Sequence, residues 1–142
     1  MSRAAALALP PLAVALALLP ACAGSAARPA PPPAVVQRPP GGGEARLRLT
    51  ASAVARLGLR TARVAEGPAG AVSVPYSALL YGRDGRTWVY VSPAPLVFVR
   101  RAVTVAAIAG PVARLAAGPP RGALVVSEGG AELHGLEFGV VQ

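Results

Sequence analysis

The sequence predicts a mainly β fold, a small barrel or sandwich-like domain with one short helical turn, placed after a disordered proline-rich tether. Short runs rich in Val, Leu and Tyr recur between glycine- and proline-rich breaks from residue 71 onwards, which is the spacing of an all-β domain. Residues 46–49 alternate arginine with leucine, as a half-buried strand does. All six aromatic residues lie beyond residue 75, so the core draws its large side chains from the C-terminal part.

Residues 1–21 have the form of a lipoprotein-type signal peptide. Arg3 precedes an apolar run that Pro10 and Pro11 interrupt, and this run is too short to make a comfortable membrane-spanning helix of about 20 residues. Cys22, the only cysteine, ends the run in LPAC. This ending resembles the lipobox of bacterial lipoproteins, in which the leader is cut before the cysteine and the thiol carries diacylglycerol. Cleavage elsewhere, after AGSAA, and an uncleaved membrane anchor are the alternatives.

Residues 22–43 are predicted to be a tether. They are rich in proline, end in three glycines and hold almost no large apolar group. Such a segment buries too little surface to offset the entropy lost on ordering. We therefore expect the anchor and the folded part, residues 44–142, to be separable.

The folded part is predicted to begin with a strand, a short helix and a second strand. Leu47 and Leu49 share one strand face. Thr50 or Ser52 is suited to cap a short helical turn that Gly58 ends.

Four longer β-like stretches follow, with a weaker one between Gly110 and Gly118. They are AVSVPYSALLY, TWVYVSP, PLVFVRRAVTVAAI and ALVVS, and VARLA is the weaker one. Pro75 comes early in its stretch, at a strand start, edge or bulge, where its missing N–H is tolerated.

The polar segment GRDGR precedes the only tryptophan. Asp84 and Gly85 stand between two strands, and Asp-Gly is a strong signal for a hairpin turn that needs positive φ. In the strand that follows, Trp88 and Tyr90 share one face and Val89 and Val91 the other, so we expect both faces to be partly covered. Trp88 and Tyr90 are candidates for the core or for an interface.

Arg100 and Arg101 interrupt the apolar stretch LVFVRRAVTV. Adjacent strand residues face opposite ways, so one arginine is expected on the less buried side and the other at a bulge or strand end. A solvated kink and a partner-facing edge are both compatible with this pattern, and we retain both arginines as candidate interface residues.

The residue inventory argues against catalysis. His134 is the only histidine, and no GxSxG elbow or phosphate-binding glycine loop is present. Glu132 and His134 would share a face if they lay on a strand, but two ligands do not make a metal site. We expect a non-enzymatic protein with no cofactor and no catalytic or metal site.

All fourteen basic residues are arginine, which with the Ala, Gly and Pro excess is typical of a GC-rich genome, and the net charge is +8. Such a charge favours anionic surfaces, including membranes and acidic wall polymers. Export argues against nucleic acid as a partner.

Residues 74–140 resemble the C-terminal part of periplasmic adaptor subunits, or membrane fusion proteins, of resistance-nodulation-division efflux pumps, especially the heavy-metal branch. The matching segments are VPYSALLYGRDGRTWVYV, FVRRAVTV and GPPRGALVVSEGGAELHGLEFGV, and RLRLTASAVARLGLRTARV looks like the piece that such adaptors carry before their hairpin. In that family the two pieces come together as a membrane-proximal β-domain. Here only EGPAGAV separates them, and no long heptad helix is available to form the hairpin.

The resemblance implies a non-catalytic, lipid-anchored protein on the periplasmic side of the membrane. Its partner would be an inner-membrane transporter subunit or another envelope protein, and only the pump-proximal half of the adaptor role carries over without a hairpin. The alternative from another class is a lipoprotein that binds a metal ion or a wall polymer through its β-domain.

Overall fold

The computed structural model describes residues 32–41 and 43–139. The expected signal peptide and Cys22 lie outside these residues. Two short 3-10 turns occur at Pro68–Gly70 and Tyr76–Ala78. The elements in chain order are β1 (Ala34–Gln37), β2 (Arg46–Leu49), α1 (Ala51–Arg56), β3 (Arg60–Arg63), β4 (Ala65–Glu66), β5 (Val72–Pro75), β6 (Leu80–Tyr81), β7 (Thr87–Ala94), β8 (Val97–Ala109), β9 (Val112–Ala117), β10 (Leu124–Glu128) and α2 (Gly130–Phe138).

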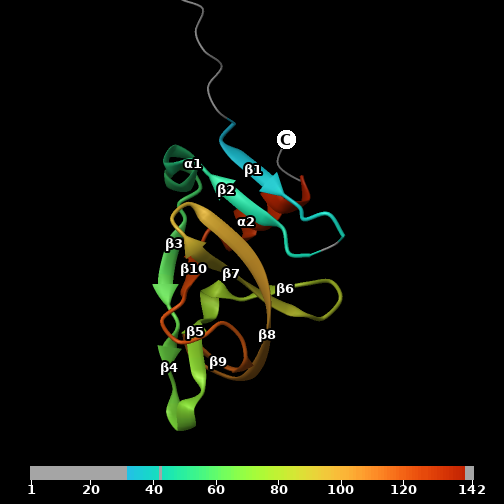
Figure 1. Ribbon diagram of the computed structural model, residues 1–142. Coiled ribbons are helices and arrows are strands. Elements are labelled where there is room, and N and C mark those ends of the chain that lie inside the picture. The colour runs from blue at the N-terminus through green and yellow to red at the C-terminus, as the bar shows by residue number, and fades with distance from the viewer. Residues whose placement is uncertain (1–31, 42, 140–142) are drawn as a thin grey trace, which may run out of the picture. The chain divides into compact units, whose positions relative to one another are not determined.

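The prediction of a mainly β, barrel-like fold is confirmed. Antiparallel pairing runs in the order β3-β10-β7-β8-β9-β5-β4. The two end strands of this order, β3 and β4, are consecutive in the chain and are separated only by Val64. One run of chain therefore supplies both edges, and the sheet curls into a nearly closed barrel (Figure 1).

Val64 is the point where this run passes from one edge to the other. Its N–H donates to the Ala123 carbonyl oxygen at 2.8 Å, and its own carbonyl accepts from the Gly122 N–H at 2.9 Å. The side chain is 2% exposed and belongs to the barrel core. Both backbone groups are thus satisfied where the ladder is interrupted.

β7 and β10 separate two hydrophobic cores. Val89 and Val125 face the barrel interior, whereas Tyr90 and Val126 face a second core formed with β1, β2, α1 and α2. Val89 and Tyr90 are each fully buried. The expectation that both faces of the TWVYV strand are covered is confirmed, and the alternation of strand side chains is the reason.

The strand, short helix and strand over residues 46–63 are also confirmed. The Thr50 hydroxyl caps α1 by accepting from the Ala53 N–H at 3.2 Å. Gly58 follows the helix with φ of 63°, a conformation that favours glycine.

The predicted tether is wrong for residues 34–37. They form β1, which pairs antiparallel with β2 over Ala34 to Gln37. Ala34 and Val36 pack against the second core, so two small apolar side chains and a ladder of backbone hydrogen bonds stabilise the strand between prolines.

GRDGR is a hairpin turn between β6 and β7, as predicted. The Gly82 N–H donates to the Arg86 carbonyl at 2.8 Å, and Gly85 has φ of 76°. Asp84 accepts from the Arg86 N–H at 3.1 Å through Oδ1 and pairs with the Arg86 guanidinium at 3.3 Å through Oδ2. The polar cluster is therefore local to the turn.

The second helix, α2, was not predicted. The glycines of SEGGAEL indicated a break, and Gly129 does adopt φ of 83° as the residue preceding the helix, with no capping side chain. The helix then packs Leu133, which is fully buried, into the second core. Tertiary packing outweighs the weak helical signal of two glycines.

Gly129→Ala is expected to destabilise the fold more than Gly85→Ala. Both glycines have positive φ, which costs an alanine roughly 1–2 kcal/mol. At Gly85 the added methyl has open space, whereas at Gly129 it would overlap the Leu59 side chain and lie 3.2 Å from the Leu57 carbonyl oxygen. We expect an extra cost of about 1–3 kcal/mol at Gly129, measured as the difference in free energy of unfolding in urea. Equal costs would show that Leu59 moves aside freely.

Candidate functional site

β7 and β8 bring three of the four candidate interface residues onto one face. Tyr90 is directly opposite Arg100 in the antiparallel register, and Trp88 is two residues before Tyr90. This face looks toward α2, because Tyr90 and Leu133 belong to the same core. Trp88, Tyr90 and Arg100 thus form a cluster with the C-terminal helix.

Glu137 of α2 lies at the centre of this cluster and is 4% exposed. Its Oε2 accepts from the Tyr90 hydroxyl at 2.6 Å. The Arg100 Nε lies 3.2 Å from each carboxylate oxygen. A buried carboxylate is costly unless it is paired and hydrogen-bonded, and here it is both.

Two aromatic rings hold the Arg100 guanidinium. Its central carbon lies 4.3 Å from the Trp88 ring centroid and 5.1 Å from that of Phe138. Both distances are within cation–π range. Trp88 therefore packs against an arginine of its own chain, and its ring is only partly accessible.

Arg38 adds a contact from the segment after β1. Its guanidinium donates to the Glu137 backbone carbonyl, one of the carbonyls that the end of a helix leaves without an intrahelical partner. A cation at this end also complements the helix dipole. The segment before β2 and the last turn of α2 are thus joined although they are far apart in sequence.

A cavity of about 380 Å³ adjoins the cluster. Its walls include Arg38, Glu44, Trp88, Arg100 and Glu137. Two guanidinium groups and two carboxylates line it, so the charges balance. The Glu137 carboxylate is already bonded to Tyr90 and Arg100, so the arrangement joins α2 to the sheet and exposes no free nucleophile or base.

Burial raises the pKa of Tyr90 well above its ordinary value of 10.0, and the hydrogen bond to Glu137 raises it further. The positive charge of Arg100 acts in the opposite direction. The hydroxyl is therefore a neutral donor at all physiological pH values.

Arg101 does not join the cluster. It is opposite Val89, so it lies on the other face of β8, and it forms an ion pair with Glu44. The predicted kink or bulge at Arg100 and Arg101 is wrong, because the β7–β8 register is regular from Thr87 to Val91 and its irregularity comes later, between Val91 and Ala94. Of the two options for Tyr90, the structure gives core packing.

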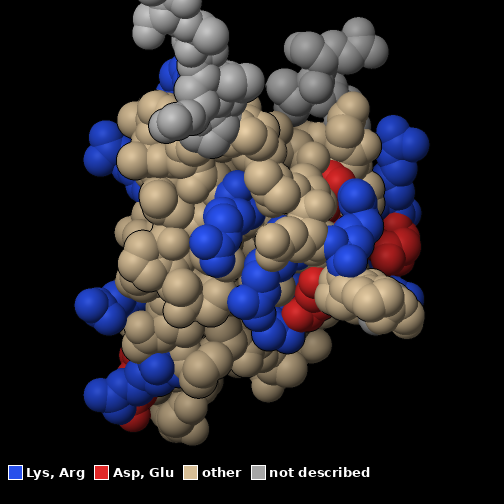
Figure 2. All heavy atoms as spheres, turned by 45° about the horizontal axis from the view of Figure 1, so that its top comes forward, with Lys and Arg blue, Asp and Glu red and all other residues tan. Residues whose placement is uncertain are grey.

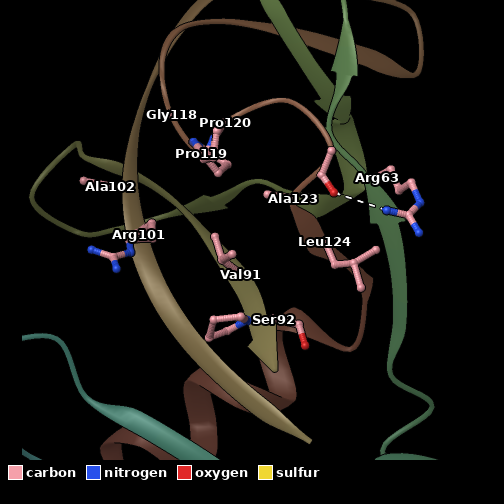
Figure 3. Close-up of a pocket in the computed structure, with 12 residues that line it drawn as sticks. Arg63, Val91, Ser92, Arg101, Ala102, Gly118, Pro119, Pro120, Ala123 and Leu124 are labelled. Atoms are coloured by element: carbon pink, nitrogen blue, oxygen red, sulfur yellow. Dashed lines mark hydrogen bonds between the residues drawn. The ribbon is translucent and has the colours of Figure 1, made fainter. Parts of the chain in front are cut away.

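A cavity of about 690 Å³ lies beside Arg101 (Figure 3). Figure 3 shows Arg63 and Arg101 on opposite sides of it, with Val91, Leu124 and Pro119 between them. Arg101 is directed away from the cavity, whereas the Arg63 guanidinium donates to the Gly122 carbonyl oxygen at 3.4 Å. The Ser92 hydroxyl donates to the Ala94 carbonyl at 3.1 Å. Apolar side chains and backbone therefore form most of the wall, and no reactive side chains converge there.

Glu132 and His134 lie on α2 and not on a strand. Residues two apart on a helix point to different sides. Glu132 and His134 therefore do not share the face that a joint role as metal ligands would require. His134 instead packs its ring 4.6 Å from that of Phe138, centroid to centroid. Within residues 32–41 and 43–139, no three His, Cys, Asp or Glu residues are grouped as metal ligands.

Glu137 and Arg38 were missed by the sequence reasoning. The sequence placed Glu137 only as a possible neighbour of Glu132 and His134, and its position one helical turn after Leu133 becomes a signal only once α2 is recognised. Arg38 was assigned to the tether, where nothing marks it as different from the other arginines.

The chain matches no protein-family model, no curated protein and no solved structure. In the part of the chain that the structure describes, no helix is long and apolar enough to cross a membrane.

Glu137→Ala is expected to lower the free energy of unfolding by about 3 kcal/mol, because it leaves the Tyr90 hydroxyl and the Arg100 guanidinium without their acceptor. Glu132→Ala is the matched control, since Glu132 is exposed on the same helix, and it should change stability by less than about 0.5 kcal/mol. Urea unfolding of both variants measures this. Similar small effects would mean that α2 is held without a contribution from the Glu137 carboxylate.

Stability is expected to fall at alkaline pH in a way that depends on Tyr90. The folded state holds the Tyr90 proton above the unfolded pKa of about 10, so the stabilisation is complete below that pH and is lost as pH rises, by up to about 1.4 kcal/mol per pH unit. Tyr90→Phe should flatten this decline. Urea unfolding between about pH 8 and about pH 12 compares the two proteins, and parallel profiles would exclude Tyr90 as the cause.

Proposed function

We propose that this protein is an exported, lipid-anchored and non-catalytic accessory subunit of an envelope transporter, similar to the pump-proximal part of a periplasmic adaptor. The observation that carries the proposal is the pairing of early with late strands. β2 pairs with β8, and β3 pairs with β10. The two pieces of sequence that carry the resemblance therefore build one domain, which is the arrangement that the resemblance implies.

The exposed apolar side chains support a protein partner. Several are close to the β8–β9 hairpin: Val112 is 41% exposed and pairs with Pro75, and Tyr76, which follows Pro75, is 45% exposed and donates its N–H to the Pro111 carbonyl. Ile108, on the other arm of the hairpin, is 50% exposed. Aromatic and aliphatic residues grouped in this way are typical of the centre of an interface.

The site chemistry is consistent with a binding role. The polar groups of the Tyr90, Arg100 and Glu137 cluster bond to one another, and the 690 Å³ cavity is lined mainly by apolar groups and backbone. A domain of this kind acts through its surface.

Photo-crosslinking from native membranes tests the proposal. A photoreactive amino acid replaces Tyr76 in a tagged full-length chain, and the matched control replaces Ala55, which is exposed on α1. We expect the Tyr76 position to capture an inner-membrane transporter at a yield at least about tenfold above the Ala55 position, since captured residues lie in the contact.

A parallel experiment tests the anchor. Cys22→Ser should release the chain from membranes or leave its leader uncut, and it should reduce the capture at Tyr76. Unchanged membrane fractionation and unchanged mature mass would exclude lipidation at Cys22.

In the photo-crosslinking experiment, capture of only lipid or wall fragments at the Tyr76 position, or of nothing specific, would contradict the transporter proposal.

A further inference from the structure

The arginines without an acidic partner are concentrated at one end of the described fold. Ion pairs occupy five arginines among the described residues: Arg60 with Glu128, Arg86 with Asp84, Arg100 with Glu137, Arg101 with Glu44 and Arg121 with Glu66. Of the other described arginines, Arg38, Arg46, Arg48 and Arg56 fall within β1, β2, α1 and their connections, whereas Arg63, Arg83 and Arg114 are distributed singly over the rest.

Arg46 and Arg48 stand on one face of β2. Both are exposed, while Leu47 and Leu49 between and beside them are buried in the second core. On β1, Gln37 is opposite Arg46 and Val35 is opposite Arg48, so these side chains share the face. We call these four residues the β1–β2 face.

The β8 side chains beside these arginines are apolar. On β8, Val99 is opposite Arg46 and Val97 is opposite Arg48, and each valine is only 5% exposed. Directly opposed side chains on one face are in contact, and arginine characteristically lays its aliphatic stem along an apolar surface while the guanidinium stays in water. The face thus presents guanidinium heads above valine side chains.

An exposed apolar side chain completes the face. Val35 is 40% exposed directly beside Arg48. Guanidinium groups that alternate with apolar groups match the boundary of an anionic bilayer, where phosphates lie just outside the acyl chains. Figure 2 turns this end of the molecule toward the reader and shows basic side chains among uncharged ones, with acidic side chains beside some of them.

If Cys22 carries lipid, as expected from the sequence, the anchor lies twelve residues before the start of β1. The 31 residues that precede the described part join it directly before β1, the strand that carries Val35. We propose that the β1–β2 face docks on an anionic phospholipid surface through Arg46 and Arg48. This inference rests on the proposed function only for the location of the chain in the cell envelope.

Vesicle binding by the full-length chain tests the docking. The chain carries Cys22→Ser, so that no attached lipid contributes, and binding is measured to phosphatidylcholine vesicles and to vesicles of equal parts phosphatidylcholine and phosphatidylglycerol. The ratio of the two affinities isolates the electrostatic contribution, because the apolar leader acts on both. R46Q/R48Q should lower this ratio at least about tenfold, since each arginine at an anionic surface contributes about a fivefold gain.

R83Q/R114Q is the matched control. It removes the same charge from the β6–β7 turn and from β9, and distances beyond about 10 Å are screened at ordinary ionic strength, so the ratio should stay within about twofold of the parent. Unfolding midpoints of both variants establish that each is folded.

Three outcomes would overturn the docking. Equal losses in both variants would mean that only net charge matters, and an unchanged ratio in R46Q/R48Q would exclude the face. Binding of a polyglutamate peptide is measured in parallel. If R46Q/R48Q loses this binding but keeps the vesicle ratio, the β1–β2 face binds an acidic polypeptide and not lipid. Neither Cys22 lipidation nor a transporter enters this test, so its failure and the failure of the proposed function are separable.

Discussion

The structure depends on β7 and β10 being covered on both faces. A strand that alternates Val89 with Tyr90 cannot face water on either side, so it needs one core inside the barrel and another outside it. The barrel supplies the first core. The layer of β1, β2, α1 and α2 supplies the second core. This explains why residues 34–59 and the C-terminal helix converge on the same face of the sheet although the barrel lies between them in sequence.

A charged network at the edge of the second core determines how α2 is placed. Leu133 buries apolar area, but apolar contacts tolerate small rotations and shifts of a helix. The Tyr90 hydroxyl, the Arg100 guanidinium and the Glu137 carboxylate are directional, and they meet only in one rotation and one position of α2. The network thus contributes specificity at a desolvation cost that its internal hydrogen bonds offset.

The barrel strands, β2 and α1 follow from sequence patterns, whereas β1 and α2 do not. The Asp84–Gly85 turn, the capping by Thr50 and the alternation around Leu47 are local, so each could be predicted from neighbouring residues. The residues of β1 and α2 favour other conformations, because prolines surround β1 and glycines begin α2. β1 is stabilised by pairing with β2 and packing on the second core, and α2 by partners distant in the chain. Glu137 could not be recognised as a central residue, because its partners Tyr90 and Arg100 meet it only in the folded state.

The division of one strand run between β3 and β4 has a kinetic consequence. β4 and β5 are close neighbours in sequence, as are β7 and β8, and such pairings form with little loss of chain entropy. The β3–β10 seam joins Arg63 to Leu124, so nearly all of the barrel sequence lies in the loop that it closes. We therefore expect folding to proceed from hairpins to seam, with the rate of barrel completion set by the pairing that has the highest contact order.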